Sequence, residues 1–133
     1  MRARDIMTTP TFALTPSATL AEAAEVMTSH GFTTMPVVGS GGQLLGLLSE
    51  ADILRAPVPS GDPDTGVMLD GGPSTAGSVM RTHGLAVPAD TDVRELARLM
   101  TDAEVRSAPV VEGGHVVGMV TFRDVLRATA GRP

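Results

Sequence analysis

Two short stretches of the sequence place a hydroxyl group and a carboxylate three residues apart. The pairs are Ser49 with Asp52 and Thr121 with Asp124, and each follows a glycine and two aliphatic residues. A Ser or Thr here caps the start of a helix, whose free N–H groups and positive end of the dipole favour a phosphate. An Asp in the first turn can accept hydrogen bonds from both hydroxyls of a ribose. The combination suits a ribose-phosphate, but the same spacing is also a helix-capping pattern, and the two roles are compatible.

The two motifs close two copies of one repeat. Residues 5–39 align with 78–112 at 10 of 35 positions, and residues 41–56 align with 113–128 at 7 of 16. In the second block five of the nine other positions exchange one aliphatic residue for another, and a single gap separates the two blocks. The chain is therefore a tandem duplication.

Each copy has the pattern of a β-α-β-β-α unit. A capping-box spacing, Thr19 to Glu22 or Asp92 to Glu95, opens a helix with apolar residues at helical spacing. Short aliphatic runs on either side of a Gly-rich turn predict two strands. The elements expected in copy one are an extended segment at 12–14, a helix from 19, strands at 36–38 and 44–48, and a helix from 49. Those in copy two are an extended segment at 85–87, a helix from 92, strands at 109–111 and 116–120, and a helix from 121.

Composition excludes several classes of protein. The formal net charge is −5, all ten basic residues are Arg, and none forms the basic patch expected of a nucleic-acid-binding or membrane-surface protein. No apolar run is long enough to span a bilayer or to act as a signal peptide, so we expect a cytoplasmic protein. The chain has three Phe and neither Trp nor Tyr, which predicts an aliphatic core filled by residues such as Met27 and Met100.

The closing motif and the Pro-Val-Val strands at 36–38 and 109–111 resemble the CBS-domain family, and the pair resembles the arrangement called a Bateman module. The resemblance covers nearly the whole chain outside the connector. It implies an α+β fold of two β-α-β-β-α repeats about a pseudo-twofold axis, each with a three-stranded sheet and two helices on one face. The expected organisation is CBS domain 1 at residues 1–56, a flexible Pro/Gly/Asp-rich linker at 57–76, and CBS domain 2 at 77–133.

The resemblance also implies which residues bind a ligand in the cleft between the repeats. Asp would bind ribose hydroxyls, Ser or Thr would lie near phosphate, residues before the Pro-Val strand would contact adenine, and the first segment of the other repeat would complete each site. The Asp124 site would contain Thr121, Asp124, Arg123, Arg106, Ser107, Ala108, Met119, Met7, Pro10 and Phe12. A weaker Asp52 site would contain Ser49, Asp52, Thr33, Thr34, Leu47, Met80, His83 and Leu85.

The charges around the two motifs differ. The second copy has Arg123 inside the motif and Arg106 before its Pro-Val strand, where the first has Ala51 and Thr33, and the first also carries Glu50. Because arginine binds phosphate well, we expect the Asp124 site to take a charged nucleotide. The Asp52 site would stay empty or take a less anionic adenosine compound. The alternative interpretation is that Arg123 and Arg106 are solvated surface residues that bind no phosphate.

Nothing in the sequence assembles a catalytic or metal site. The three histidines lack ligand spacing, there is no Cys, and neither motif hydroxyl has a base nearby. His30 and His115 are expected on the surface. We therefore expect neither enzymatic activity nor a required cofactor.

The prediction is a regulatory module that senses an adenosine-containing ligand: AMP, ADP, ATP or S-adenosylmethionine. It would signal to an effector protein in trans, because nothing on this chain acts as the effector. The resemblance implies a homodimer formed through the helices. The alternative is a dimerisation or interaction scaffold that binds no nucleotide.

Overall fold

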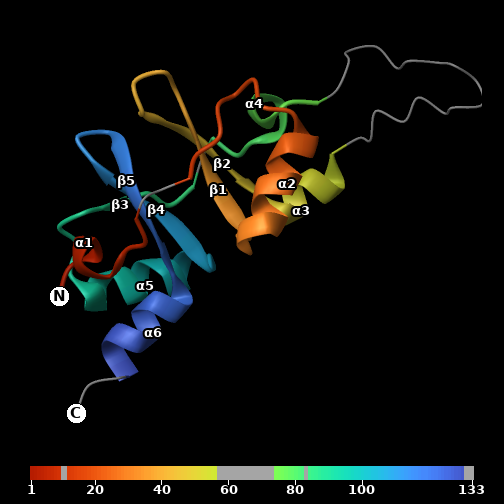
Figure 1. The fold of residues 1–133 in the computed structure, drawn as a ribbon. Helices are drawn as coiled ribbons and strands as arrows, with labels where there is room; N and C mark the ends of the chain where they lie inside the picture. Colours follow the sequence, from red (N-terminus) through yellow and green to blue (C-terminus); the bar gives the residue numbers. More distant parts are fainter. Residues whose placement is uncertain (10–11, 57–73, 83, 131–133) are drawn as a thin grey trace, which may run out of the picture.

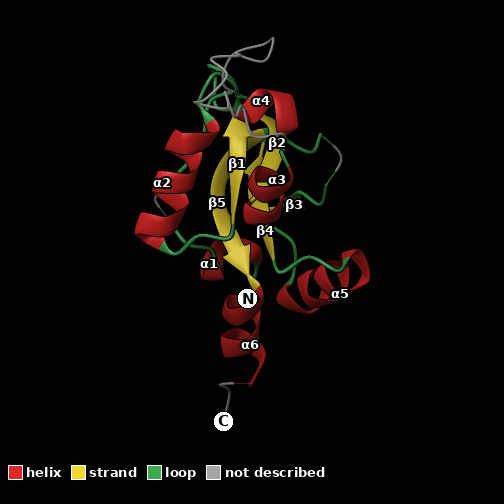
Figure 2. Ribbon diagram, turned by 90° about the vertical axis from the view of Figure 1, so that its right-hand side faces the viewer, coloured by secondary structure: helices red, strands yellow, loops and turns green. Residues whose placement is uncertain are grey.

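A computed structural model describes residues 1–9, 12–56, 74–82 and 84–130. Two small sheets lie next to each other, and each is covered by two helices (Figure 1). A view from the side shows the strands of both repeats in the centre, with α2 (Leu20–His30) and α5 (Val93–Ala103) on opposite sides (Figure 2). The duplicated α+β architecture expected from the sequence is confirmed.

The sheet of the second repeat has three strands in the order β3-β4-β5. β3 (Val87–Pro88) pairs parallel with β4 (Ser107–Glu112), which pairs antiparallel with β5 (His115–Thr121). The turn between β4 and β5 contains Gly113 and Gly114, both with positive φ.

The sheet of the first repeat has only two full strands, which differs from the three expected. β1 (Thr34–Val38) and β2 (Leu44–Ser49) form an antiparallel hairpin, and the third strand is reduced to one parallel bridge between Leu14 and Val37. In the second repeat the ladder continues because the N–H of Ala89 donates to Val111 at 2.9 Å. The equivalent residue in the first repeat is Pro16, which has no N–H, so the ladder ends.

The helices begin close to where their caps predict. Thr19 Oγ1 accepts from the N–H of Glu22 at 3.1 Å at the start of α2. Asp92 caps α5, but it accepts from Arg94 at 3.0 Å and not from Glu95. The closing helices are α3 (Glu50–Arg55) and α6 (Phe122–Ala130), directly after the Ser and Thr of the two motifs.

Two four-residue helices, which the sequence did not predict, begin the two copies. They are α1 (Ala3–Ile6) and α4 (Ala76–Val79), and each packs on the core of the other repeat. Ala3 is fully buried in the second core and Ala76 in the first. The chain after each helix then pairs with the opposite repeat, Thr8 with Met119 and Arg81 with Leu47. The exchange of first segments implied by the family resemblance is therefore present.

The two cores are aliphatic and equivalent. Met27 and Met100 are buried at their centres, at 2% and 0% exposure. The second core contains Ala3, Val87, Ala89, Val93, Leu96, Met100, Ala108, Val110, Val120, Val125 and Ala128. The first contains Leu14, Ala23, Met27, Met35, Val37, Leu48 and Ala76.

The glycine of each motif is explained by the crossing segments. A Cβ atom on Gly46 would lie 2.7 Å from the sulfur of Met80 and 2.8 Å from the carbonyl oxygen of Arg81. Gly118 has the same relation to the side chain of Met7. Only glycine allows the first segment of one repeat to lie this close to the strand of the other.

The predicted linker at 57–76 ends earlier than expected. Residues 57–73 lie outside the described residues. Ser74 and Thr75 already pair with the first repeat, since the N–H of Leu20 donates to Ser74 at 3.2 Å and Thr75 bridges Thr19. Ala76 is buried and starts α4, so it belongs to the folded structure.

Candidate functional site

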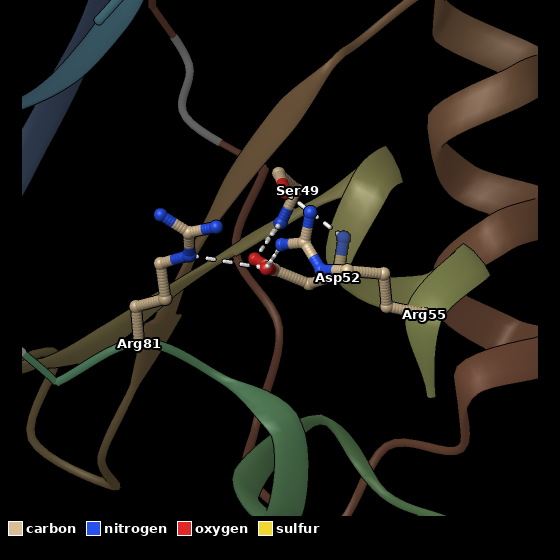
Figure 3. Close-up of polar contacts among 4 residues, drawn as sticks. All are labelled: Ser49, Asp52, Arg55 and Arg81. Carbon is tan, nitrogen blue, oxygen red and sulfur yellow. Dashed lines mark hydrogen bonds and ion pairs between the residues drawn. The ribbon is translucent and has the colours of Figure 1, made fainter. Parts of the chain in front are cut away.

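Asp52 lies at the start of α3 with its side chain 6% exposed. Its Oδ2 accepts from the N–H of Ser49 at 2.9 Å, and its own N–H donates to Ser49 Oγ at 3.1 Å. Its Oδ1 accepts from Arg55 Nη2 at 2.7 Å and from Arg81 Nε at 3.1 Å (Figure 3). Arg81 comes from the second copy, 29 residues along the chain. The carboxylate therefore caps its helix and joins the two copies.

The pKa of Asp52 is below its ordinary value. Burial acts to raise this pKa, but hydrogen bonds from Ser49 and the hydrogen bond and ion pair with Arg81 together outweigh burial. The carboxylate is thus held in its charged form, ready to accept hydrogen bonds.

Replacement of Asp52 by Asn should lower the free energy of unfolding by about 1.5 kcal/mol at pH 7, because the ion pairs are lost and a capping oxygen remains. A carboxylate with a lowered pKa stabilises the fold above its unfolded pKa, and this stabilisation disappears as the pH falls through the folded value. The difference between Asp52→Asn and the parent should therefore shrink as the pH falls below about 4.

Urea denaturation of both proteins between pH 7 and pH 3 measures this difference, with the exposed Asp90→Asn as a control of equal charge change. A deficit for Asp52→Asn that is equal at both pH values would contradict the stabilising role of the charge.

A cavity of about 570 Å³ opens beside Asp52 and is lined by both repeats. Six of the eight residues predicted for the Asp52 site line it: Thr33, Thr34, Leu47, Ser49, Asp52 and Leu85. Of the other two, Met80 packs against Gly46 at the edge of the first core, and His83 lies outside the described residues. This volume falls in the range of small-molecule sites.

Asp124 has a similar cap but weaker partners. Its Oδ2 accepts from the N–H and the hydroxyl of Thr121 at 2.9 and 3.0 Å, and its N–H donates back to the hydroxyl oxygen at 3.2 Å. The nearest cation is Arg127 at 3.9 Å, on the same helix. No residue of the other copy forms an ion pair with Asp124 within the described part of the chain.

The cavity next to Thr121 is small, about 110 Å³. Four residues predicted for the Asp124 site line it: Thr121, Ser107, Met119 and Phe12. Thr8, Gly31, Phe32, Thr33, Thr34 and Met35 complete the lining. Phe12 and Phe32 lie 5.7 Å apart between ring centroids, and His30 stacks on Phe32, which makes this part of the cleft largely apolar.

The other described residues predicted for the Asp124 site do not line this cavity, although Asp124 is hydrogen-bonded to Thr121 at its edge. Ala108 is fully buried in the second core, so its side chain is closed to a ligand. Met7 packs against Gly118, and Pro10 lies outside the described residues. Arg123 is exposed and does not line the cavity beside Thr121.

The cavities group Arg106 differently from the prediction. Arg106 lines the larger cavity with Asp52, not the cavity beside Thr121, and Ser107 lines both. β1 and β4 contact each other, and Thr33, Thr34 and Ser107 line both cavities.

Arg81 was missed by the sequence analysis although the repeat alignment contains the signal. The residue equivalent to Arg81 in the first copy is Thr8. Each lies in the crossing segment, and each bridges the strand that leads into the opposite motif. The larger cavity therefore has two arginines, Arg81 and Arg106, whereas a threonine takes the place of Arg81 beside Thr121. The asymmetry of positive charge is the reverse of the one expected.

Three of the N–H groups at the start of α3 already have acceptors within the protein. Those of Ser49 and Asp52 are used by the reciprocal cap, and that of Glu50 donates to the carbonyl oxygen of Thr33 at 3.0 Å. The equivalent N–H of Phe122 donates to the carbonyl oxygen of Arg106 at 2.8 Å. The guanidinium groups of Arg81 and Arg106 are the only cationic groups among the described residues that line the larger cavity, so they are the strongest partners it offers a phosphate.

The described part of the chain contains neither a metal-binding cluster nor a membrane-spanning helix. No group of three or more His, Asp or Glu side chains there is arranged to hold a metal ion. None of its helices is long and apolar enough to cross a membrane.

The CBS domain profile matches residues 3–59 and 76–131, and the chain belongs to the CBS-domain family. Hypoxic response protein 1 of Mycobacterium tuberculosis is 32% identical over 126 residues, which is 94% of this chain and 82% of the relative. The CBS domain-containing protein YhcV of Bacillus subtilis is 30% identical over 123 residues, which is 92% of this chain and 81% of YhcV.

Solved CBS-pair structures have the same fold. A crystal structure of Hypoxic Response Protein I with two coordinated zinc ions has a TM-score of 0.76 at 30% identity, covering 96% of this chain and 98% of that one. CBSX2 in complex with AMP has a TM-score of 0.82 at 26% identity, covering 98% and 96%. The CBS pair of MJ0100 has a TM-score of 0.81 at 24% identity, covering 100% of this chain and 98% of that one, and it has the same fold.

Proposed function

We propose that this CBS pair is a regulatory module that binds an adenosine monophosphate-type ligand in the cavity beside Asp52. The observation that carries the proposal is the composition of this cavity. It combines a charged, ordered carboxylate with two arginines, and it is lined by both repeats, with a volume of about 570 Å³.

Each part of such a ligand has a suitable partner. The carboxylate of Asp52 would accept from the ribose hydroxyls, and Arg81 and Arg106 would bind the phosphate. Leu47 and Leu85 provide apolar surface for the base. AMP in the complex of the related CBSX2 supports this class of ligand.

The acidic residues of the cavity limit the charge of the ligand. Glu50 and Glu104 also line it, so three carboxylates including Asp52 face two guanidinium groups. A ligand with several phosphates would meet more repulsion than one with a single phosphate. We therefore propose AMP ahead of ADP and ATP, with S-adenosylmethionine as the cationic comparison.

Thermal unfolding with AMP, ADP, ATP, S-adenosylmethionine and NAD tests the proposal. AMP at about 100 times its Kd should raise the Tm by about 5–10 °C, because it binds only the folded state. A flat response to the whole panel would reject the ligand site and favour the alternative, a scaffold that binds no nucleotide.

The module is proposed to act as a homodimer, without catalytic activity of its own, on an effector protein in trans. Leu54 on α3 and Leu126 on α6 support the dimer, because they occupy equivalent positions and are 83% and 61% exposed. Two exposed leucines on the closing helices suit a self-complementary apolar contact between copies.

A further inference from the structure

Both oxygens of Asp52 are already occupied in the free protein. Oδ2 accepts from the N–H of Ser49, and Oδ1 accepts from both Arg55 and Arg81. A ribose whose two hydroxyls donate hydrogen bonds to this carboxylate must displace at least one of these donors. The site therefore has a resident competitor for the ligand.

Arg81 is the donor best placed to leave. Its side chain is 62% exposed, close to the 60% of Arg55, and its Nε donates to Asp52 at the longer distance of 3.1 Å. Figure 3 shows that only this nitrogen of Arg81 is joined to Asp52. Arg55 is held closer, at 2.7 Å, from the same helix as Asp52. Arg81 lines the cavity whereas Arg55 does not, so a displaced Arg81 remains beside the ligand.

The other repeat lacks this arrangement. Thr8 takes the place of Arg81, and Oδ1 of Asp124 has only Arg127 at 3.9 Å. The competing arginine is thus a property of one site and not of the repeat.

We propose that Arg81 determines which ligands the cavity accepts, by exchanging its bond to Asp52 for a bond to the ligand's phosphate. The proposal rests on the function proposed above. An uncharged nucleoside would break the Asp52–Arg81 ion pair and leave Arg81 without a new partner. A nucleoside monophosphate would replace that bond with a charge-assisted bond from the same guanidinium to phosphate. The exchange therefore favours a ligand with a phosphate over one without, whatever the fit of the base and ribose in the cavity.

Binding of AMP and adenosine by isothermal titration calorimetry tests the exchange. The parent should prefer AMP over adenosine by about 30-fold, the difference expected for a hydrogen-bonded charge pair. Arg81→Thr introduces the residue found at this position in the other repeat. It should weaken the binding of AMP and leave the binding of adenosine unchanged or tighter, so that the preference for AMP falls below about 3-fold. Arg81→Lys keeps the charge and should retain most of the preference.

Arg55→Thr is the matched control, because it removes the other guanidinium on Asp52 without removing a cation from the cavity. It should change both affinities by a similar factor and keep their ratio. If the parent binds AMP and the preference for AMP over adenosine is retained in Arg81→Thr, the exchange is rejected and the proposed function still stands. A parent that binds neither compound would overturn both.

Discussion

The Asp52→Ala variant is expected to bind AMP about 100-fold more weakly than the parent, because two hydrogen bonds from the ribose to a charged acceptor are lost. Asp124→Ala is the matched control. Both changes remove an Asp that caps a closing helix, so both carry a similar capping cost. Asp124 lines neither of the cavities beside the two motifs, and its replacement should change AMP affinity by less than about 3-fold.

Calorimetric titration of the two variants and the parent measures these affinities, with circular dichroism to verify folding. Equal losses would mean that the sites are equivalent. A larger loss for Asp124→Ala would restore the expectation from the sequence, in which the second motif takes the charged nucleotide. Either result would reject the Asp52 cavity as the main site.

Local patterns in the sequence predict most of the fold. The duplication, the four strands of the two hairpins and the starts of the four long helices follow from periodicity and from caps such as Thr19. α1 and α4 were missed because four residues are too few for a helical period. The third strand of the first sheet is lost because Pro16 has no N–H to donate where Ala89 donates in the second sheet. Alignment of the two copies already places Pro16 opposite Ala89.

The site was harder to predict because its members come from both copies. The sequence groups Arg106 with the motif that follows it, and its carbonyl oxygen accepts from Phe122 there, but Arg106 also lines the cavity beside Asp52. Arg81 is 29 residues from its partner, and the contact depends on the crossing of a first segment to the opposite repeat. The charges counted along the chain therefore do not show which cavity each arginine lines, because that depends on the three-dimensional pairing of the two copies.

The double variant Leu54→Glu with Leu126→Glu is expected to convert the proposed homodimer into a monomer. In a twofold dimer each substitution occurs twice, so four carboxylates would enter the apolar contact. A loss of about 1 kcal/mol for each of the four leucines corresponds to a dimer Kd raised about 1,000-fold. Both leucines are largely exposed in the protomer, so the fold of the single chain should be retained.

Sedimentation equilibrium between about 1 and 100 μM separates the two states, since this range brackets a dimer of micromolar Kd. Leu45→Glu is the control, because Leu45 is an exposed leucine (37%) on β2 and away from the closing helices. It should leave the dimer intact. A parent that is monomeric at 100 μM, or a double variant that still dimerises, would contradict an interface at Leu54 and Leu126. The helix α3 carries both Asp52 and Leu54. In the proposed dimer, the exchange of Arg81 between Asp52 and the phosphate would therefore take place within one helical turn of the contact with the partner copy.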